Sequence, residues 1–223
     1  MLLALAGLKG GTGKTTLAVA LATEAYARGR RTLLVDLDPR ADAHAWSLSA
    51  STTMGRAPTT LRLPGAAPGQ VERLRALAFG HDLTVLDTPN DPEVLALAAS
   101  VADFVLVPCR PSPMDAWAAV DTVQACLRAR TLADFHKQVA VVPNAVDPRT
   151  TIGKALPHDL RALDLPVLEC GVHHRVAHQE SMAHGSTASL DAPASAAARD
   201  VHELLDAIEG MHGRYGDLRH IRH

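Results

Sequence analysis

Short apolar runs recur along the chain, and longer segments with apolar residues at helical spacing separate them. Short, mostly apolar runs are typical of strands that are buried on both faces of a sheet. These runs lie at residues 2–6, 31–36, 83–87, 104–108 and 138–143, with shorter ones at 60–63 and 165–168. Helices are expected at residues 15–28, around 71–78, and at 93–102, 113–130, 175–184 and 194–209, whereas 41–58 is expected to be a loop or a short helix.

The alternation of strands and helices predicts an α/β fold, a doubly wound and mostly parallel sheet with helices on both faces. With 223 residues, of which 47% are hydrophobic and only 3% aromatic, the chain can bury such a core as a single domain. We expect this domain at residues 1–212 and a short C-terminal tail at 213–223. No apolar run is long enough to cross a bilayer and no signal-peptide pattern opens the chain, so a cytoplasmic protein is expected.

A glycine-rich loop joins the first expected strand to the first expected helix. Glycines let backbone N–H groups turn toward phosphate oxygens, and the positive end of the following helix strengthens the field. In this context Lys14 would reach the β- and γ-phosphates, and the Thr15 hydroxyl would hold Mg²⁺. The sequence therefore predicts a nucleotide site made of Gly10, Gly11, Thr12, Gly13, Lys14, Thr15 and Thr16.

The loop departs from the common G-x-x-x-x-G-K-[ST] pattern, because Leu8 stands where the first glycine would fall. The form present, K-G-G-x-G-K-T, resembles the deviant Walker A motif of the ParA/MinD family of dimeric ATPases. The resemblance implies that the early lysine, Lys9, crosses to the nucleotide of a second copy, so that Lys9 and Lys14 both serve catalysis. It also implies that ATP and Mg²⁺ are the cofactors.

Carboxylates follow two of the expected strands. Ligands bind beyond the carboxyl ends of the strands in open α/β sheets, so Asp36, Asp38 and Asp87 can face the phosphates. The D-x-D-P and D-T-P segments that contain them resemble switch I and Walker B of the same family. The resemblance implies that Asp38 positions or activates the attacking water, that Asp36 supports the magnesium end of the site, and that Asp87 holds Mg²⁺ through water.

Two later segments extend the likeness to the small plasmid-partition ParA proteins. Residues 107–117 resemble their V-P-x-x-P-S-P-x-D-x-W stretch, and the V-P-N segment after the next strand implies that Asn144 reads the adenine edge. Two positions depart from the family pattern. Arg40 stands where Gln usually follows D-x-D-P, and Asn90 replaces the Gly or Pro that often follows D-T-P.

The resemblance implies an ATP-dependent homodimer that binds non-specific DNA and segregates or positions a cargo, with hydrolysis stimulated by an adaptor protein. In this family the cargo is a plasmid, a chromosome or a protein compartment such as a carboxysome, and the ATP-bound form is expected on the nucleoid. The net charge of −2 gives no global signal for nucleic acid, so DNA would need a local basic patch. The candidates, which lie among acidic residues, are Arg149, Lys154, Arg161 and Arg175.

Two other functions are weighed against this one. A MinD-like membrane-positioning ATPase needs a terminal amphipathic helix with a basic face, but the last expected helix has an acidic polar side, so no stable membrane association is expected. An amide-forming metabolic synthase shares a similar P-loop fold but has no use for a lysine such as Lys9. The cysteines, Cys109, Cys126 and Cys170, are far apart, which argues against a disulfide framework or a cluster scaffold.

Overall fold

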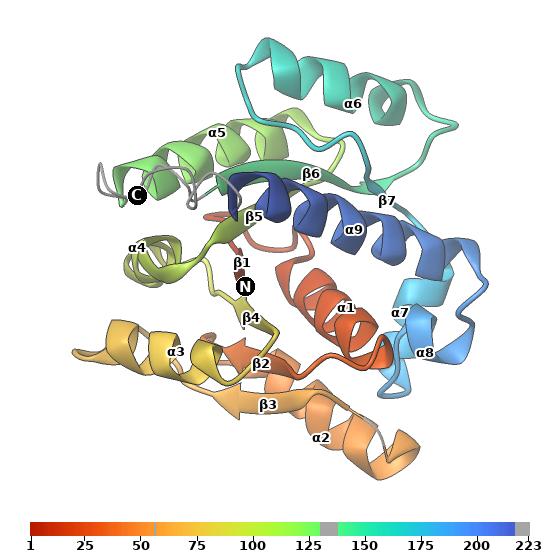
Figure 1. The fold of residues 1–223 in the computed structure, drawn as a ribbon. Helices are drawn as coiled ribbons and strands as arrows, with labels where there is room; N and C mark the ends of the chain where they lie inside the picture. Colours follow the sequence, from red (N-terminus) through yellow and green to blue (C-terminus); the bar gives the residue numbers. More distant parts are fainter. Residues whose placement is uncertain (56, 130–137, 217–223) are drawn as a thin grey trace.

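A computed structural model of the chain describes residues 1–55, 57–129 and 138–216. Its core is one sheet of seven strands in the order β3-β2-β4-β1-β5-β6-β7 (Figure 1), and every pair of neighbouring strands is parallel. The strands are β1 (Leu2–Leu5), β2 (Thr32–Asp36), β3 (Thr59–Arg62), β4 (Leu83–Asp87), β5 (Phe104–Cys109), β6 (Gln138–Val146) and β7 (Val172–His173). The predicted doubly wound parallel sheet is confirmed.

Helices cover both faces of this sheet (Figure 1). One layer contains α3, α4 and α5, and the other contains α1, α2, α8 and α9, with α9 packed beside α1. The helices are α1 (Lys14–Ala27), α2 (Asp42–Met54), α3 (Gln70–Phe79), α4 (Pro92–Val101), α5 (Pro113–Arg128), α6 (Thr151–Ala162), α7 (Val176–Ala183), α8 (Ala188–Asp191) and α9 (Ala196–Gly216). The helix α9 continues past residue 212, residues 217–223 of the expected tail lie outside the described residues, and the division of the chain at residue 212 stays a prediction.

The apolar strands divide the core into two clusters because successive side chains of a strand point to opposite faces of the sheet. In β1, Leu2 and Ala4 belong to the cluster under α3, α4 and α5, whereas Leu3 and Leu5 belong to the cluster under α1 and α9. All four residues are buried. The first strand is therefore fixed from both sides, and it holds the start of the glycine loop in a defined place.

Three segments differ from the expected elements. In the segment 41–58, expected to be a loop or a short helix, the 13 residues Asp42–Met54 form the helix α2, because Trp46 and Ala50 pack into the core beside α1. The helix α6 was not expected, since Gly153 and Pro157 interrupt its pattern, although Thr150 caps it by accepting a hydrogen bond from the Gly153 N–H. In place of the short strand expected at 165–168 there is a single β-bridge between Val167 and Val141. The seventh strand, β7, follows it at Val172–His173.

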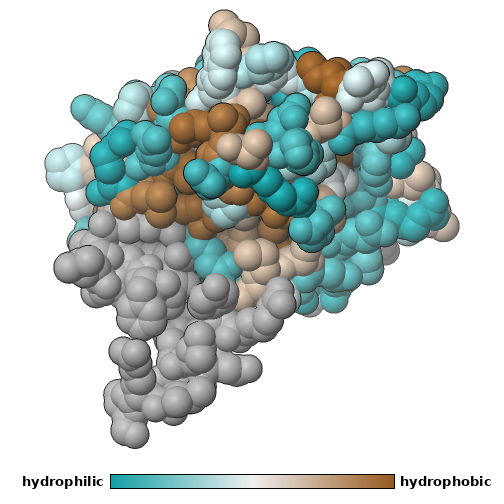
Figure 2. Space-filling view, turned by 90° about the horizontal axis from the view of Figure 1, so that it is seen from above, coloured by the Kyte–Doolittle hydropathy of each residue, from teal (hydrophilic) through white to brown (hydrophobic). Residues whose placement is uncertain are grey.

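The helices α5 and α6 leave an apolar groove of about 320 Å³ between them. Four large side chains at or beside the groove keep 41% to 61% of their surface exposed, namely Met114, Trp117, Ile152 and Leu163. Figure 2, which views the molecule from above, shows apolar side chains gathered on this face. The groove begins at the start of α5, where the buried Asp115 lies between Met114 and Trp117 in the sequence.

Candidate nucleotide site

The glycine loop between β1 and α1 has the conformation that its sequence predicts. Gly11 and Gly13 have φ angles of 75° and 98°, in the left-handed region that only glycine adopts readily. A Cβ on Gly13 would also lie 2.4 Å from Nδ2 of Asn144, so any side chain there would displace the Asn144 amide. The helix α1 begins at Lys14 with no side-chain cap, which leaves its first N–H groups available to an anion.

Asn144, at the end of β6, supports the loop from the other side. Its Nδ2 donates to the carbonyl oxygen of Thr12 at 2.7 Å, and its side chain is buried. This contact fixes the orientation of the amide, because the flipped amide would place two oxygens against each other. The role in adenine recognition that the resemblance implies for Asn144 stays a prediction, but the residue does lie at the loop.

Lys14 is buried beneath the loop and held by neutral oxygens. Its Nζ donates to the Lys9 carbonyl at 3.1 Å and to Oδ1 of Asn90 at 2.5 Å. Burial lowers the pKa of Lys14, and the negative charges of Asp87 and Asp38 oppose this shift. The ammonium group therefore sits where a phosphate can take over from Asn90, a contact that the sequence did not reveal.

Asp36 and Asp87 are direct neighbours across the β2–β4 pair, and both are fully buried. Burial raises the pKa of Asp87 to about 7, while the Thr15 hydroxyl and the Lys14 charge offset part of that rise. Neither oxygen of Asp87 has a well-formed hydrogen bond. A buried carboxylate without such a partner, next to the Thr15 hydroxyl, fits a hydrated Mg²⁺ ion.

Asp36 organises the loop that follows β2. Its Oδ1 accepts the Asp38 N–H at 3.0 Å and its Oδ2 accepts the His44 N–H at 2.9 Å. Burial raises the pKa of Asp36, and these two backbone hydrogen bonds oppose the rise. Both oxygens are thus engaged in holding Asp38 and the start of α2, and a role of Asp36 at the metal stays a prediction.

The pKa of Asp87 leads to a pH dependence of stability. A carboxyl with a raised pKa binds a proton in the folded chain where the unfolded chain has already lost it, so the free energy of unfolding falls as pH rises from about 4 to about 7. We expect Asp87→Asn to remove the part of this fall that Asp87 causes, so that the variant gains roughly 1–3 kcal/mol over the parent chain between pH 5 and pH 8. Urea unfolding of both chains at pH 5 and pH 8, without nucleotide or metal, measures this difference in the free energy of unfolding.

The exposed Asp82 provides the matched control, because its pKa is lowered to about 2 by Arg31. Asp82→Asn should shift the unfolding free energy equally at both pH values, since Asp82 is ionised throughout that range. A parent chain as stable at pH 8 as at pH 5 would contradict the assignment to Asp87.

Lys9 lies at the entrance of the loop and forms a salt bridge with Asp115 of its own chain. The side chain of Asp115 is only 7% exposed, whereas that of Lys9 is 39% exposed. In this single chain the lysine is therefore folded back onto the start of α5. Its predicted reach to a second copy requires this salt bridge to open.

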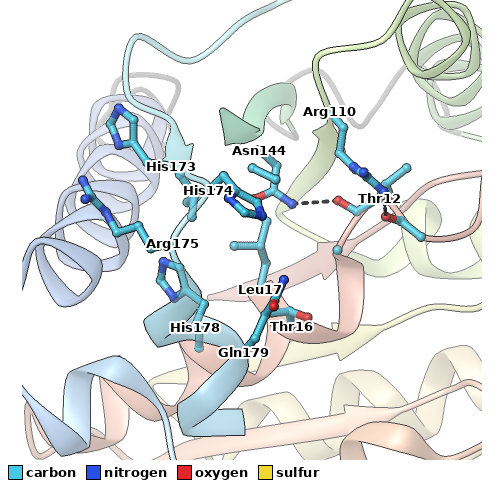
Figure 3. Close-up of a pocket in the computed structure, with 15 residues that line it drawn as sticks. Thr12, Thr16, Leu17, Arg110, Asn144, His173, His174, Arg175, His178 and Gln179 are labelled. Carbon is cyan, nitrogen blue, oxygen red and sulfur yellow. Dashed lines mark hydrogen bonds between the residues drawn. The ribbon is translucent and has the colours of Figure 1, made fainter. Parts of the chain in front are cut away.

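Two cavities meet at the glycine loop. One, of about 300 Å³, is lined by the loop and by Lys14, Thr15, Asp38, Arg40 and Asn90, so it collects the groups expected for phosphates and metal. The other, of about 240 Å³, extends away from Gly11 and Thr16 and is shown in Figure 3. Because Gly11, Gly13 and Thr16 border both cavities, a nucleotide can place its phosphates in the first and its nucleoside in the second.

The second cavity has an apolar floor and a polar wall. Leu17 lies at the floor, and Asn144, His174, His178 and Gln179 surround it (Figure 3). Burial lowers the pKa of His178, and its buried Nε2 has no hydrogen-bond partner among the described residues. An apolar floor with a few convergent polar groups is typical of a small-molecule site. Sequence reasoning missed His178, since a single histidine on a helix carries no signal.

The predicted DNA-binding arginines are each paired with an acid of the same chain. Arg149 pairs with Asp147, Arg161 with Glu169, and Arg175 with the buried Asp200, each at 2.9 Å. Arg175 thereby ties the start of α7 to α9, so its position has a structural reason. Within the described part of the chain Lys154 makes no salt bridge. DNA contacts of all four residues stay a prediction.

The described residues contain no group of three or more His, Cys, Asp or Glu side chains arranged to hold a metal. Among the described helices, none combines the length and the apolar composition that a membrane crossing needs.

Comparisons with known proteins agree with this geometry. Residues 3–188 match the family described as the CobQ/CobB/MinD/ParA nucleotide binding domain. The chain is 31% identical over 209 residues to the maintenance of carboxysome distribution protein A of Halothiobacillus neapolitanus, covering 92% of this chain and 95% of that protein. It is 34% identical over 184 residues to the protein of the same name from Gloeobacter kilaueensis, covering 79% and 78%. Among solved structures, the septum site-determining protein MinD of Pyrococcus horikoshii, complexed with Mg-ADP, aligns with a TM-score of 0.75 and 17% identity over 96% of this chain and 98% of that one.

Proposed function

Because the chain belongs to the CobQ/CobB/MinD/ParA family of nucleotide-binding domains, we propose that it is an ATPase that dimerises with ATP bound and positions or segregates a cargo on DNA. The observation that carries the proposal is Lys9, a lysine at the entrance of the glycine loop in addition to Lys14. A second subunit's triphosphate would give Lys9 a role at the nucleotide that Lys14 does not already perform. A metabolic synthase has no such need.

ATP fits the second cavity better than GTP does. Since Nδ2 of Asn144 donates to Thr12, the oxygen is the acceptor end of that side chain at the cavity. An acceptor there suits the amino group of adenine and repels the carbonyl oxygen of guanine. We therefore infer that the chain selects ATP.

The residues of the first cavity fit phosphoryl transfer. The glycine loop and Lys14 bind and orient the phosphates, and Thr15 with Asp87 would hold Mg²⁺, which neutralises phosphate charge when bound. Asp38 stands at the rim with its backbone fixed by Asp36, where it can orient the attacking water. Hydrolysis would then weaken the dimer, because the γ-phosphate leaves as inorganic phosphate and the remaining ADP attracts Lys9 less strongly.

The cargo is proposed from the relatives. Two proteins at least 31% identical to this chain maintain carboxysome distribution by their names, which supports a protein compartment as the cargo, with a plasmid or a chromosome as the other members of the class. We propose that an adaptor bound to the cargo stimulates hydrolysis. The ATP dimer would hold to DNA, and so to the nucleoid, through phosphate contacts that do not depend on base sequence.

The function is tested by binding to a fluorescent duplex DNA of arbitrary sequence in the presence of Mg²⁺ and ATP, ADP or GTP. We expect binding with ATP only, and a loss of at least about a hundredfold in affinity between roughly 50 mM and 200 mM salt. The double variant Arg149→Glu, Lys154→Glu should weaken binding and reduce the salt dependence, since it removes two candidate phosphate contacts. The control is Arg75→Gln, an exposed arginine of α3.

DNA binding that is equal with and without nucleotide would contradict the proposal. So would ATP turnover that requires a small carboxylate and ignores DNA, which is the behaviour of an amide-forming synthase.

A further inference from the structure

The loop after β2 brings a further cation to the phosphate cavity. Arg40 lines this cavity together with Lys14, Asp38 and Thr15. The glycine loop lines the same cavity, with Gly10, Gly11 and Gly13. Arg40 therefore borders the space that the phosphates are expected to occupy.

The backbone around Arg40 is held in place. The Arg40 N–H donates to Oδ1 of Asp38 at 2.9 Å, and Arg62 donates to the carbonyl oxygen of Pro39 at 3.0 Å. Asp38 is itself fixed by the buried Asp36 at 3.0 Å. The side chain of Arg40 thus starts from a defined point at the rim of the cavity.

The side chain itself is held loosely. It is 75% exposed, its NH2 group donates to Asp42 at 3.1 Å, and its Nε lies 3.9 Å from Oδ2 of Asp38. Exposed ion pairs of this kind contribute little to stability. A terminal phosphate offers a guanidinium a bidentate, charge-assisted contact, which is roughly twice as strong as a neutral hydrogen bond. Arg40 can therefore leave Asp42 for a phosphate at small cost.

The γ-phosphate is the group that Arg40 would meet. The side chain of Lys14 is buried, whereas that of Arg40, on the loop after β2, is 75% exposed, so Arg40 lines the cavity from its open side. Lys14 can reach the β- and γ-phosphates from the buried side, which leaves the outer oxygens of the terminal phosphate to Arg40. We propose that Arg40 binds the γ-phosphate of ATP from within the same subunit and thereby makes the chain discriminate ATP from ADP. The inference rests on the proposed function.

The test is isothermal titration calorimetry of the full chain with Mg²⁺ and either ADP or the non-hydrolysable analogue AMPPNP. We expect Arg40→Gln to raise the Kd for AMPPNP about tenfold or more and to leave the Kd for ADP within about twofold. The Kd of Arg40→Lys for AMPPNP should lie between those of the parent chain and Arg40→Gln, because lysine keeps the positive charge but loses the bidentate hydrogen bonding of the guanidinium. Arg75→Gln on α3 is the matched control and should change neither Kd.

The same titrations in a Lys9→Ala background separate an effect within one subunit from an effect across a dimer. The loss of AMPPNP affinity on Arg40→Gln should persist there. Its disappearance would overturn the inference, and so would equal losses for ADP and AMPPNP, no loss for either, or a defect confined to DNA binding. A parent chain that binds neither nucleotide would overturn the proposed function itself, and the inference with it.

Discussion

Lys9→Ala is expected to abolish ATP-dependent dimerisation while leaving nucleotide binding intact. ATP can favour a dimer only by binding it better than it binds two separate subunits. In the proposed switch Lys9 supplies that difference, because its charge would meet a second triphosphate only when two subunits face each other. Light scattering after size exclusion, with Mg²⁺ and AMPPNP, should show the parent chain at twice its mass of 23.6 kDa and the variant at that mass.

Two further variants make this experiment decisive. Lys154→Ala removes an exposed lysine from α6 and should dimerise as the parent chain does. Asp115→Asn weakens the salt bridge that holds Lys9 on its own subunit, so it should dimerise at a severalfold lower protein concentration. If Lys9→Ala forms the dimer normally with AMPPNP, the lysine has no part in the switch.

The sheet was predictable because its strands carry strong local signals. The buried runs around β1, β2, β4 and β5 are apolar nearly throughout, because the strands of a parallel sheet are covered by helices on both faces. The helix α2 was not predictable, since its alanines, serines and threonines show little contrast between its faces. Its position depends on the hydrogen bond from the His44 N–H to the Asp36 carboxylate and on Trp46 packing against the core. Both are tertiary contacts, which the local sequence pattern does not reveal.

The candidate site was predictable in its list of residues but not in its contacts. The glycine loop and the acids at the strand ends can be recognised from their spacing in the sequence. The structure brings Lys14, Thr15, Asp38 and Asp87 together at the loop. The hydrogen bond from Asn144 to Thr12 joins residues that are 132 positions apart. No spacing rule encodes such a contact, because it arises from the order of β1, β5 and β6 in the sheet.

Both departures from the family pattern lie at the phosphate cavity. Asn90 accepts a hydrogen bond from Lys14, and Arg40 lies between Asp38 and Asp42. The two departures thus supply contacts to Lys14, Asp38 and Asp42, all of which line this cavity.

Asp38→Ala is expected to trap the ATP-bound dimer. Asp38 is the carboxylate at the rim of the cavity that can orient the attacking water, and loss of such a group typically slows the chemical step by 10² to 10⁴. Lys14, Thr15 and the glycine loop remain, so ATP and Mg²⁺ should still bind. Phosphate release should therefore fall at least about a hundredfold, while light scattering with ATP shows a dimer that persists for as long as ATP is present.

Asp42→Ala is the matched control, because Asp42 carries the same charge four residues later and is largely exposed at the start of α2. It should hydrolyse ATP within a few-fold of the parent chain. Asp38 also accepts a hydrogen bond from the Arg40 N–H, and Asp38→Asn retains an oxygen for it. This variant therefore distinguishes a defect caused by a disordered loop from one caused by the loss of the carboxylate. Slow turnover by both Asp38 variants assigns the defect to the carboxylate, whereas rapid turnover by Asp38→Asn reduces Asp38 to a support for the loop.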